Sequence, residues 1–166
     1  MKSALTVALL LVANTAVAGK ADLEQFAERY FDAWHATQQP GATPAVLDAY
    51  LALLDEDVGY EHKPYRLLED AGDGSAHGAA PQRGSPSASG KALMREGMTF
   101  YLGKNSAYDA KLVSVATADN AVALQYEGVH VFRRGGEGPE ITERFTAMDV
   151  LEVSEGRVII IRHFRD

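Results

Sequence analysis

The spacing of apolar residues changes once along this sequence, near residue 107, and that change limits the fold more than any other feature. Before it, apolar residues recur every three or four positions in three segments, 22–38, 43–54 and 91–103. After it, apolar and polar residues alternate in four segments, 108–116, 121–134, 140–153 and 157–165. Helices followed by consecutive hairpins are typical of α+β folds. We therefore expect three N-terminal helices on one face of a curved antiparallel sheet, which leaves a concavity for a small ligand.

The first 18 residues have the features of a secretory signal peptide. Lys2 supplies a positive charge, residues 4–13 form an apolar run, and Ala16-Val17-Ala18 matches a cleavage site. The run is shorter than the roughly 20 residues that span a bilayer. An uncleaved anchor or a buried helix is the alternative interpretation. We expect cleavage after Ala18, a periplasmic or secreted location, and a single domain over residues 19–166.

Composition narrows the range of partners. The chain has 166 residues, a formal net charge of −7 and no cysteine. An acidic chain without a basic stripe is not expected to bind nucleic acid, nor a membrane once the signal peptide is removed. Without disulfides, the domain must be held by its core. Residues 69–90 are rich in Gly, Ala, Ser and Pro, which predicts a flexible insertion. We expect no cofactor.

Alternation assigns the residues of each strand to two faces, but it does not say which face meets the helices. In the last segment, Ile159, Ile161 and His163 share one face, while Val158 and Ile160 share the other. Both faces carry apolar residues, so the period alone leaves the inner face undecided.

Three stretches of the sequence resemble the SnoaL-like members of the NTF2-like superfamily. They are "DEDVGYEHKPY", the helix start "GKAL" and the ending "DVLEVSEGRVIIIRHFRD". The ending is similar to the "V-F-E-x-x-D-G-K-I-x-x-W-R-D-Y-F-D" tail of the limonene-epoxide-hydrolase branch. The resemblance implies the NTF2-like cone, in which three helices pack on a curved antiparallel sheet. It covers most of the chain from Asp22 to Asp166, with 69–90 as an insertion.

The resemblance departs from the hydrolase branch where the chemistry would be. A catalytic aspartate of that branch falls on His163, and its arginine and second aspartate fall on Gly128 and His130. The early "Y-x-N" motif reads Tyr60-Glu61-His62, which keeps the tyrosine and replaces the asparagine. Epoxide hydrolysis by that mechanism is therefore not expected.

The resemblance also implies which face is the inner one. It directs six strand residues toward the pocket: Gly128, His130, Phe145, Ala147, Asp149 and His163. The candidate catalytic residues are then His163, Asp149, His130 and Tyr60. The candidate ligand-binding residues are His62, Phe31, Trp34, Tyr126 and Phe145. Each of these residues taken alone has an alternative role in the core or on the surface, and only their convergence favours a site.

The leading hypothesis is acid–base chemistry on a small, largely apolar molecule, of the isomerase, cyclase or dehydratase type that the resemblance implies. His163 would act as the base and Asp149 would orient its ring. Tyr60 or His130 would donate a hydrogen bond to a developing oxyanion. The first alternative is a binding protein without chemistry. The second is a metal pocket built from the histidines and Asp149, for which the sequence offers no short ligand spacing.

The outer face of the predicted sheet also carries apolar residues, which favours a homodimer. These residues are Val129, Val131, Met148, Val150, Val158 and Ile160. The resemblance points the same way, because NTF2-like sheets frequently dimerise through this face.

Overall fold

The computed structural model describes residues 19–63, 90–133 and 138–165. The predicted signal peptide and nearly all of the predicted insertion at 69–90 lie outside these residues. None of the helices in the described ranges is both long enough and apolar enough to cross a bilayer.

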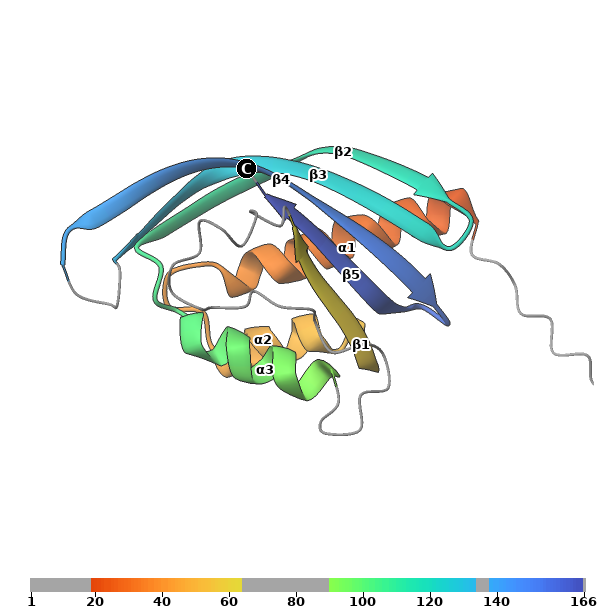
Figure 1. The fold of residues 1–166 in the computed structure, drawn as a ribbon, viewed down its shortest axis with the longest axis horizontal. Coiled ribbons are helices and arrows are strands. Elements are labelled where there is room, and N and C mark those ends of the chain that lie inside the picture. The colour runs from red at the N-terminus through yellow and green to blue at the C-terminus, as the bar shows by residue number, and fades with distance from the viewer. Residues whose placement is uncertain (1–18, 64–89, 134–137, 166) are drawn as a thin grey trace, which may run out of the picture.

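The described residues form three helices and one five-stranded sheet, which confirms the predicted α+β class (Figure 1). The elements are α1 (Lys20–Thr37), α2 (Pro44–Leu51), β1 (Leu54–Lys63), α3 (Gly90–Tyr101), β2 (Ala107–Ala118), β3 (Ala121–Arg133), β4 (Glu140–Ser154) and β5 (Arg157–Arg165). The strand order is β1-β5-β4-β3-β2. Three of the four strand pairs are antiparallel, while the edge strand β1 pairs with β5 in parallel. The sheet is therefore mostly antiparallel.

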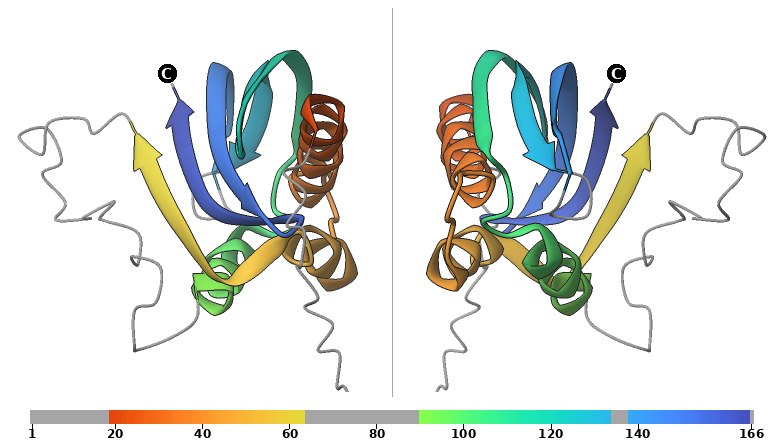
Figure 2. Two further views of the ribbon diagram at one scale, coloured as in Figure 1. Left: turned by 90° about the vertical axis from the view of Figure 1, so that its right-hand side faces the viewer. Right: turned by 90° about the vertical axis from the view of Figure 1, so that its left-hand side faces the viewer.

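The sheet is strongly curved, and the helices lie on its concave side (Figures 1 and 2). Helix α1 packs against β2 and β3, and α3 packs against β1. Helix α2 lies between α1 and α3 and contacts both. This arrangement closes one end of the concavity, as the predicted cone requires.

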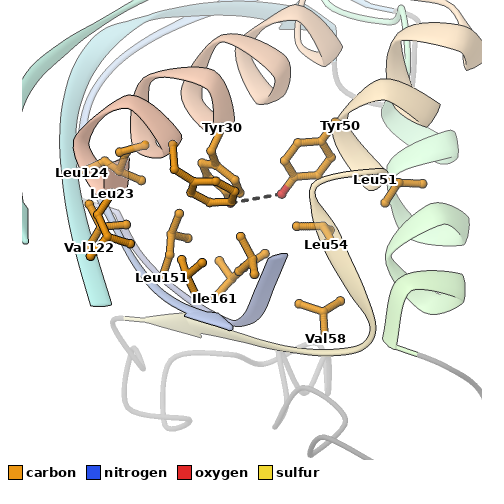
Figure 3. Close-up of a cluster of buried hydrophobic side chains, with 14 of the residues drawn as sticks. Leu23, Tyr30, Tyr50, Leu51, Leu54, Val58, Val122, Leu124, Leu151 and Ile161 are labelled. Carbon is orange, nitrogen blue, oxygen red and sulfur yellow. Dashed lines mark hydrogen bonds between the residues drawn. The ribbon is translucent and has the colours of Figure 1, made fainter. Parts of the chain in front are cut away.

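One buried cluster holds the two layers together (Figure 3). Helix α1 contributes the apolar stripe expected from its helical spacing, and β3 and β4 each contribute alternate residues. The members include Leu23, Phe26, Tyr30, Leu47, Tyr50, Leu51, Leu54, Val58, Val122, Leu124, Leu151, Val153, Val158 and Ile161. Because these residues come from α1, α2 and all strands except β2, the core joins the helical half of the sequence to the β half.

A bulge in β5 alters the predicted alternation. The pairing with β4 passes from Glu152↔Ile160 to Val153↔Val158, so Ile159 is the extra residue. Val158 is consequently fully buried in the core, and its prediction as an outer-face residue is wrong. Beyond the bulge, Ile161 is buried on the inner face, and His163 follows it on the same face.

Candidate functional site

Asp149 and His163 form a hydrogen-bonded pair on the inner face of the sheet. They are direct cross-strand partners in the antiparallel β4–β5 register, so their side chains leave the sheet on the same side. Nδ1 of His163 lies 2.6 Å from Oδ1 of Asp149. The side chain of Asp149 is 4% exposed and that of His163 is 13% exposed. A buried carboxylate of this kind requires donors to replace water.

Three tyrosines supply further hydrogen bonds around this carboxylate. The Tyr126 hydroxyl lies 3.4 Å from Oδ1 of Asp149 and 3.3 Å from Nδ1 of His163. From α1, the Tyr30 hydroxyl donates to Oδ2 over 3.5 Å. The Tyr30 hydroxyl also lies 3.1 Å from that of Tyr50 on α2 (Figure 3). The carboxylate of Asp149 therefore accepts hydrogen bonds from residues of both the helical and the β segments.

The surroundings keep these tyrosines protonated. Burial is the largest cause that raises the pKa of Tyr126 and of Tyr60, and the negative charge of Asp149 raises both further. Burial also raises the pKa of Tyr30 and of Tyr50 far above the usual value. Each hydroxyl consequently retains its proton at neutral pH and can donate a hydrogen bond.

A pocket of about 420 Å³ lies beside the Asp149–His163 pair. Its walls come from α1, α2, α3, β1, β4 and β5. They comprise Tyr30, Trp34, Gln38, Tyr50, Val58, Tyr60, Gly90, Leu93, Met94, Gly97, Met98, Tyr101, Asp149, Ile161 and His163. Among these described residues there is no lysine or arginine. The site therefore offers one carboxylate, one imidazole and several hydroxyl groups within largely apolar walls.

Four of the residues predicted from the sequence line this pocket: His163, Asp149, Tyr60 and Trp34. Tyr126 contacts the Asp149–His163 pair. Phe31 and Phe145 do not line the pocket. They belong to a second buried cluster, with Tyr108, Tyr126 and Ala147, that packs behind the pair. The ring of Phe31 lies 5.5 Å from that of Tyr126, so Phe31 supports the tyrosine from the side of α1.

The structure does not bring His130 to the pair. His130 lies on the expected face, but it is four residues from Tyr126 along β3, or about 13 Å of extended strand. Its Nε2 lies 2.9 Å from Oδ1 of Asn105, and its ring stacks on Phe132. Its Nδ1 is buried without a hydrogen-bond partner in the described part of the chain. Burial, and secondarily Arg165, lower the pKa of His130.

Comparison with known proteins identifies the fold. No family model matches the sequence, and no curated protein matches it significantly. Solved structures do match. A candidate SnoaL-like polyketide cyclase from Jannaschia sp. CCS1 has a TM-score of 0.57 at 13% identity, covering 86% of this chain and 84% of that one. An LEH-like epoxide hydrolase from M. tuberculosis has a TM-score of 0.54 at 18% identity, with the same coverage. The chain has the SnoaL-like fold.

A third matching structure, a candidate ketosteroid isomerase from Kribbella flavida DSM 17836, has a TM-score of 0.51. It is 20% identical and covers 86% of this chain and 76% of that one. The predicted resemblance to the NTF2-like superfamily is thus confirmed at the level of the fold.

The structure leaves no room for a side chain at Gly128, the position where the resemblance implies the arginine of the hydrolase branch. A Cβ there would lie 2.2 Å from the carbonyl oxygen of Asp109 and 2.8 Å from Cα of Ala110. No side chain fits without moving a backbone segment, so Gly128 lets β2 and β3 approach closely instead of presenting a polar group.

The backbone of His62 pairs with that of His163 in the parallel β1–β5 register, but the side chain of His62 lies outside the described part of the structure. Among the side chains that are described, no three histidine or carboxylate groups gather closely enough to hold a metal ion. The metal hypothesis therefore receives no support from the described SnoaL-like pocket.

Sequence reasoning missed two residues that bear on Asp149. Tyr30 and Tyr50 lie in the segments 22–38 and 43–54, whose helical spacing of apolar residues indicates only that both side chains face the core. A signal was available, because a tyrosine at a buried helix position needs a partner for its hydroxyl. Their actual partners are each other and, for Tyr30, a carboxylate 119 residues away in the chain.

Proposed function

We propose that this SnoaL-like domain performs proton-transfer chemistry on a small, neutral, largely apolar molecule. One observation carries the proposal: a histidine hydrogen-bonded to a buried carboxylate lines an apolar pocket of about 420 Å³. A pocket of this size and composition suits a small organic ligand. The neighbours described as a candidate cyclase and a candidate isomerase agree with this chemistry, although their likeness extends only to the fold.

His163 is the base in this proposal and Asp149 its positioning residue. With the proton of the neutral ring on Nδ1, that nitrogen donates to Asp149 and Nε2 is the atom that accepts a proton from the substrate. When Nε2 takes this proton, the ring becomes a cation beside the carboxylate, which stabilises it. The oxygens of Asp149 already accept hydrogen bonds from His163, Tyr126 and Tyr30, so this carboxylate orients the ring of His163 and is not itself the base.

Tyr60 is the proposed donor to the substrate oxygen. It lines the same pocket as His163, and its raised pKa keeps the hydroxyl protonated. Loss of a proton next to a carbonyl group places negative charge on the carbonyl oxygen, and a preorganised hydroxyl donor in an apolar site stabilises that charge. The proton could then return from His163 to another atom of the substrate, as in an isomerisation.

The charges around the pocket favour an uncharged substrate. The described lining contains a carboxylate and no cation to neutralise an anionic ligand. Both oxygens of Asp149 already accept hydrogen bonds from His163, Tyr126 and Tyr30, which leaves this carboxylate engaged within the protein. A neutral ketone or alcohol therefore fits better than a carboxylate or a phosphate ester.

The test is exchange of carbon-bound protons in D₂O, followed by proton NMR, with a panel of neutral linear and cyclic ketones. General acid–base catalysis contributes typically 10²- to 10⁴-fold, so His163→Ala should lose about that factor. His130→Ala is the matched control, because His130 lies on the same sheet face away from the pocket, and it should keep the wild-type rate. Circular dichroism would establish that both variants fold.

Exchange that is unchanged in His163→Ala would remove the assignment of the base. Ketones that bind to the wild type and are recovered without exchange would instead support the alternative function, a binding protein without chemistry. The largely apolar lining is the observation that favours this second candidate. Export after cleavage at Ala18 and assembly as a homodimer are further proposals, to be tested by N-terminal sequencing of exported protein and by light scattering.

A further inference from the structure

Helix α3 exposes most of the large apolar surface found in the described part of the chain. Of the four large hydrophobic residues that are exposed there, three lie on α3: Leu93 at 41%, Phe100 at 63% and Tyr101 at 68%. Leu93 and Tyr101 also line the pocket. The exposed apolar surface is therefore continuous with the pocket wall, which is where a ligand extending beyond the pocket would lie.

Polar contacts and close packing fix the position of α3. At its first residue, Gly90 packs so tightly against β1 that a Cβ would lie 1.8 Å from the carbonyl oxygen of Val58. Lys91 forms an ion pair with Glu56 of β1. Arg95 forms another with Asp48 of α2. The exposed apolar residues thus belong to an anchored helix at the edge of the pocket.

Gly97 interrupts the row of side chains along this edge. Residues 93, 97 and 101 are four positions apart and lie on one face of the helix. Gly97 lines the pocket between the two large side chains of Leu93 and Tyr101, and a Cβ built on it meets no atom within 4 Å. Glycine in a helix interior is less favourable than alanine. Since alanine would fit, neither packing nor backbone conformation explains the glycine, whereas an open gap in the rim does.

We propose that Gly97 determines which ligands the pocket accepts, by leaving a gap through which the apolar tail of a neutral ligand passes out between Leu93 and Tyr101. This rests on the proposed function, because the polar end of the same ligand would lie near His163. The ligand class is then a neutral ketone or alcohol with an apolar chain longer than the pocket itself. The side chains of Leu93 and Tyr101 cover the two sides of that chain.

The experiment uses methyl n-alkyl ketones from hexanone to tetradecanone as probes. Trp34 is the only tryptophan of the protein and lines the pocket, so its fluorescence reports binding directly. Each methylene that is buried should strengthen binding about fourfold. In the wild type, affinity should keep rising through the longer ketones. In Gly97→Leu it should stop rising earlier, with the longest ketones bound more than about tenfold more weakly and the shortest unchanged.

Thr99→Leu is the matched control. It adds the same side chain to the same helix, on a side that does not line the pocket, and should leave the whole ketone series unchanged. Gly97→Ala gives a second, opposing readout. It should raise the melting temperature by a few degrees through better helix propensity while weakening the longest ketones. If the role of Gly97 were purely structural, Gly97→Ala would not stabilise the protein and at the same time weaken the binding of long-chain ketones.

The outcomes separate this inference from the proposed function. If the affinity of the wild type rises along the ketone series and Gly97→Leu gives the same series, the role of Gly97 is overturned but the proposed function is not. No ketone binding by the wild type overturns that role together with the proposed ligand class of the pocket. A wild-type series that stops at short chains, with a dimer in sedimentation that Tyr101→Ser dissociates, would assign the rim to a second copy of the chain and also overturn the inference.

Discussion

His163 and His130 lie on the same face of the same sheet, yet their surroundings differ in every respect that matters for chemistry. Nδ1 of His163 is held by a buried carboxylate at 2.6 Å, and the ring lines a pocket. Nδ1 of His130 is buried without a partner in the described residues, and the ring is stacked on Phe132 near Tyr108. One end of the inner face is thus a cavity with a paired base, and the other is a packed aromatic cluster.

The difference shows that the alternation along a strand predicts the face on which a residue lies, but not which other residues surround it there. Alternation and the resemblance correctly placed both histidines on the inner face. What distinguishes them is the distance along β3 between His130 and Tyr126, the β3 residue that contacts His163, together with the direct pairing of Asp149 with His163 across β4 and β5. We expect substitutions at the two ends to differ accordingly.

The largest effect on stability should come from Asp149→Ala. It leaves His163, Tyr126 and Tyr30 without their buried acceptor, which should lower the free energy of unfolding by about 3 kcal/mol. The equivalent truncation at the other end, His130→Ala, removes a half-buried stacked ring and should cost about 1 kcal/mol. Urea denaturation measures both. Equal losses in the two variants would contradict the distinction between the two ends.

A smaller difference is expected between two tyrosines of the second cluster. Tyr126→Phe removes a hydroxyl that contacts both Asp149 and His163, and should cost about 1 kcal/mol. Tyr108→Phe removes a hydroxyl that makes no hydrogen bond within the described residues, and should change the unfolding free energy by less than about 0.5 kcal/mol. Thermal and urea unfolding of the matched pair would check this. A larger loss of unfolding free energy in Tyr108→Phe than in Tyr126→Phe would contradict this expectation.

The smallest effect concerns pH at the His130 end. Burial lowers the pKa of His130 in the folded protein. Below pH 6.5, the ordinary pKa of histidine, His130 is therefore protonated more fully in the unfolded chain than in the folded one. This residue therefore contributes stability at neutral pH that is lost as the pH falls below about 6.5. His130→Gln should reduce the loss of stability between neutral and mildly acidic pH, measured by urea midpoints. An unchanged pH dependence would show that the ring titrates alike in both states.

Much of the fold follows from local signals in the sequence. The helical spacing of Leu23, Phe26 and Tyr30 corresponds to α1, and Thr43 followed by Pro44 marks the start of α2. The parallel pairing of β1 with β5 was not predictable from periodicity, because alternation does not encode strand direction. Nor was the bulge at Ile159, since an extra residue within a run of β-branched residues leaves no compositional mark.

The candidate site was predictable in part for similar reasons. Asp149 and His163 were predicted because the resemblance supplied the inner face. Tyr60 was predicted because it lies in a matching stretch, and Trp34 because the resemblance implies that the first helix lines the pocket. The tyrosine contacts to Asp149 depend on how α1 and α2 dock on the sheet, which is a property of tertiary packing rather than of any one segment. The position of His130 depends on the length of the β3–β4 hairpin, which carries it away from the pocket.

Nitrogen-15 NMR of the His163 ring, at a pH where the ring is neutral, would show whether Asp149 prepares His163 to act as a base. We expect a proton on Nδ1, with a downfield resonance that disappears in Asp149→Ala. A neutral ring that carries its proton on Nε2, or one whose signals are the same with and without the carboxylate, would contradict it.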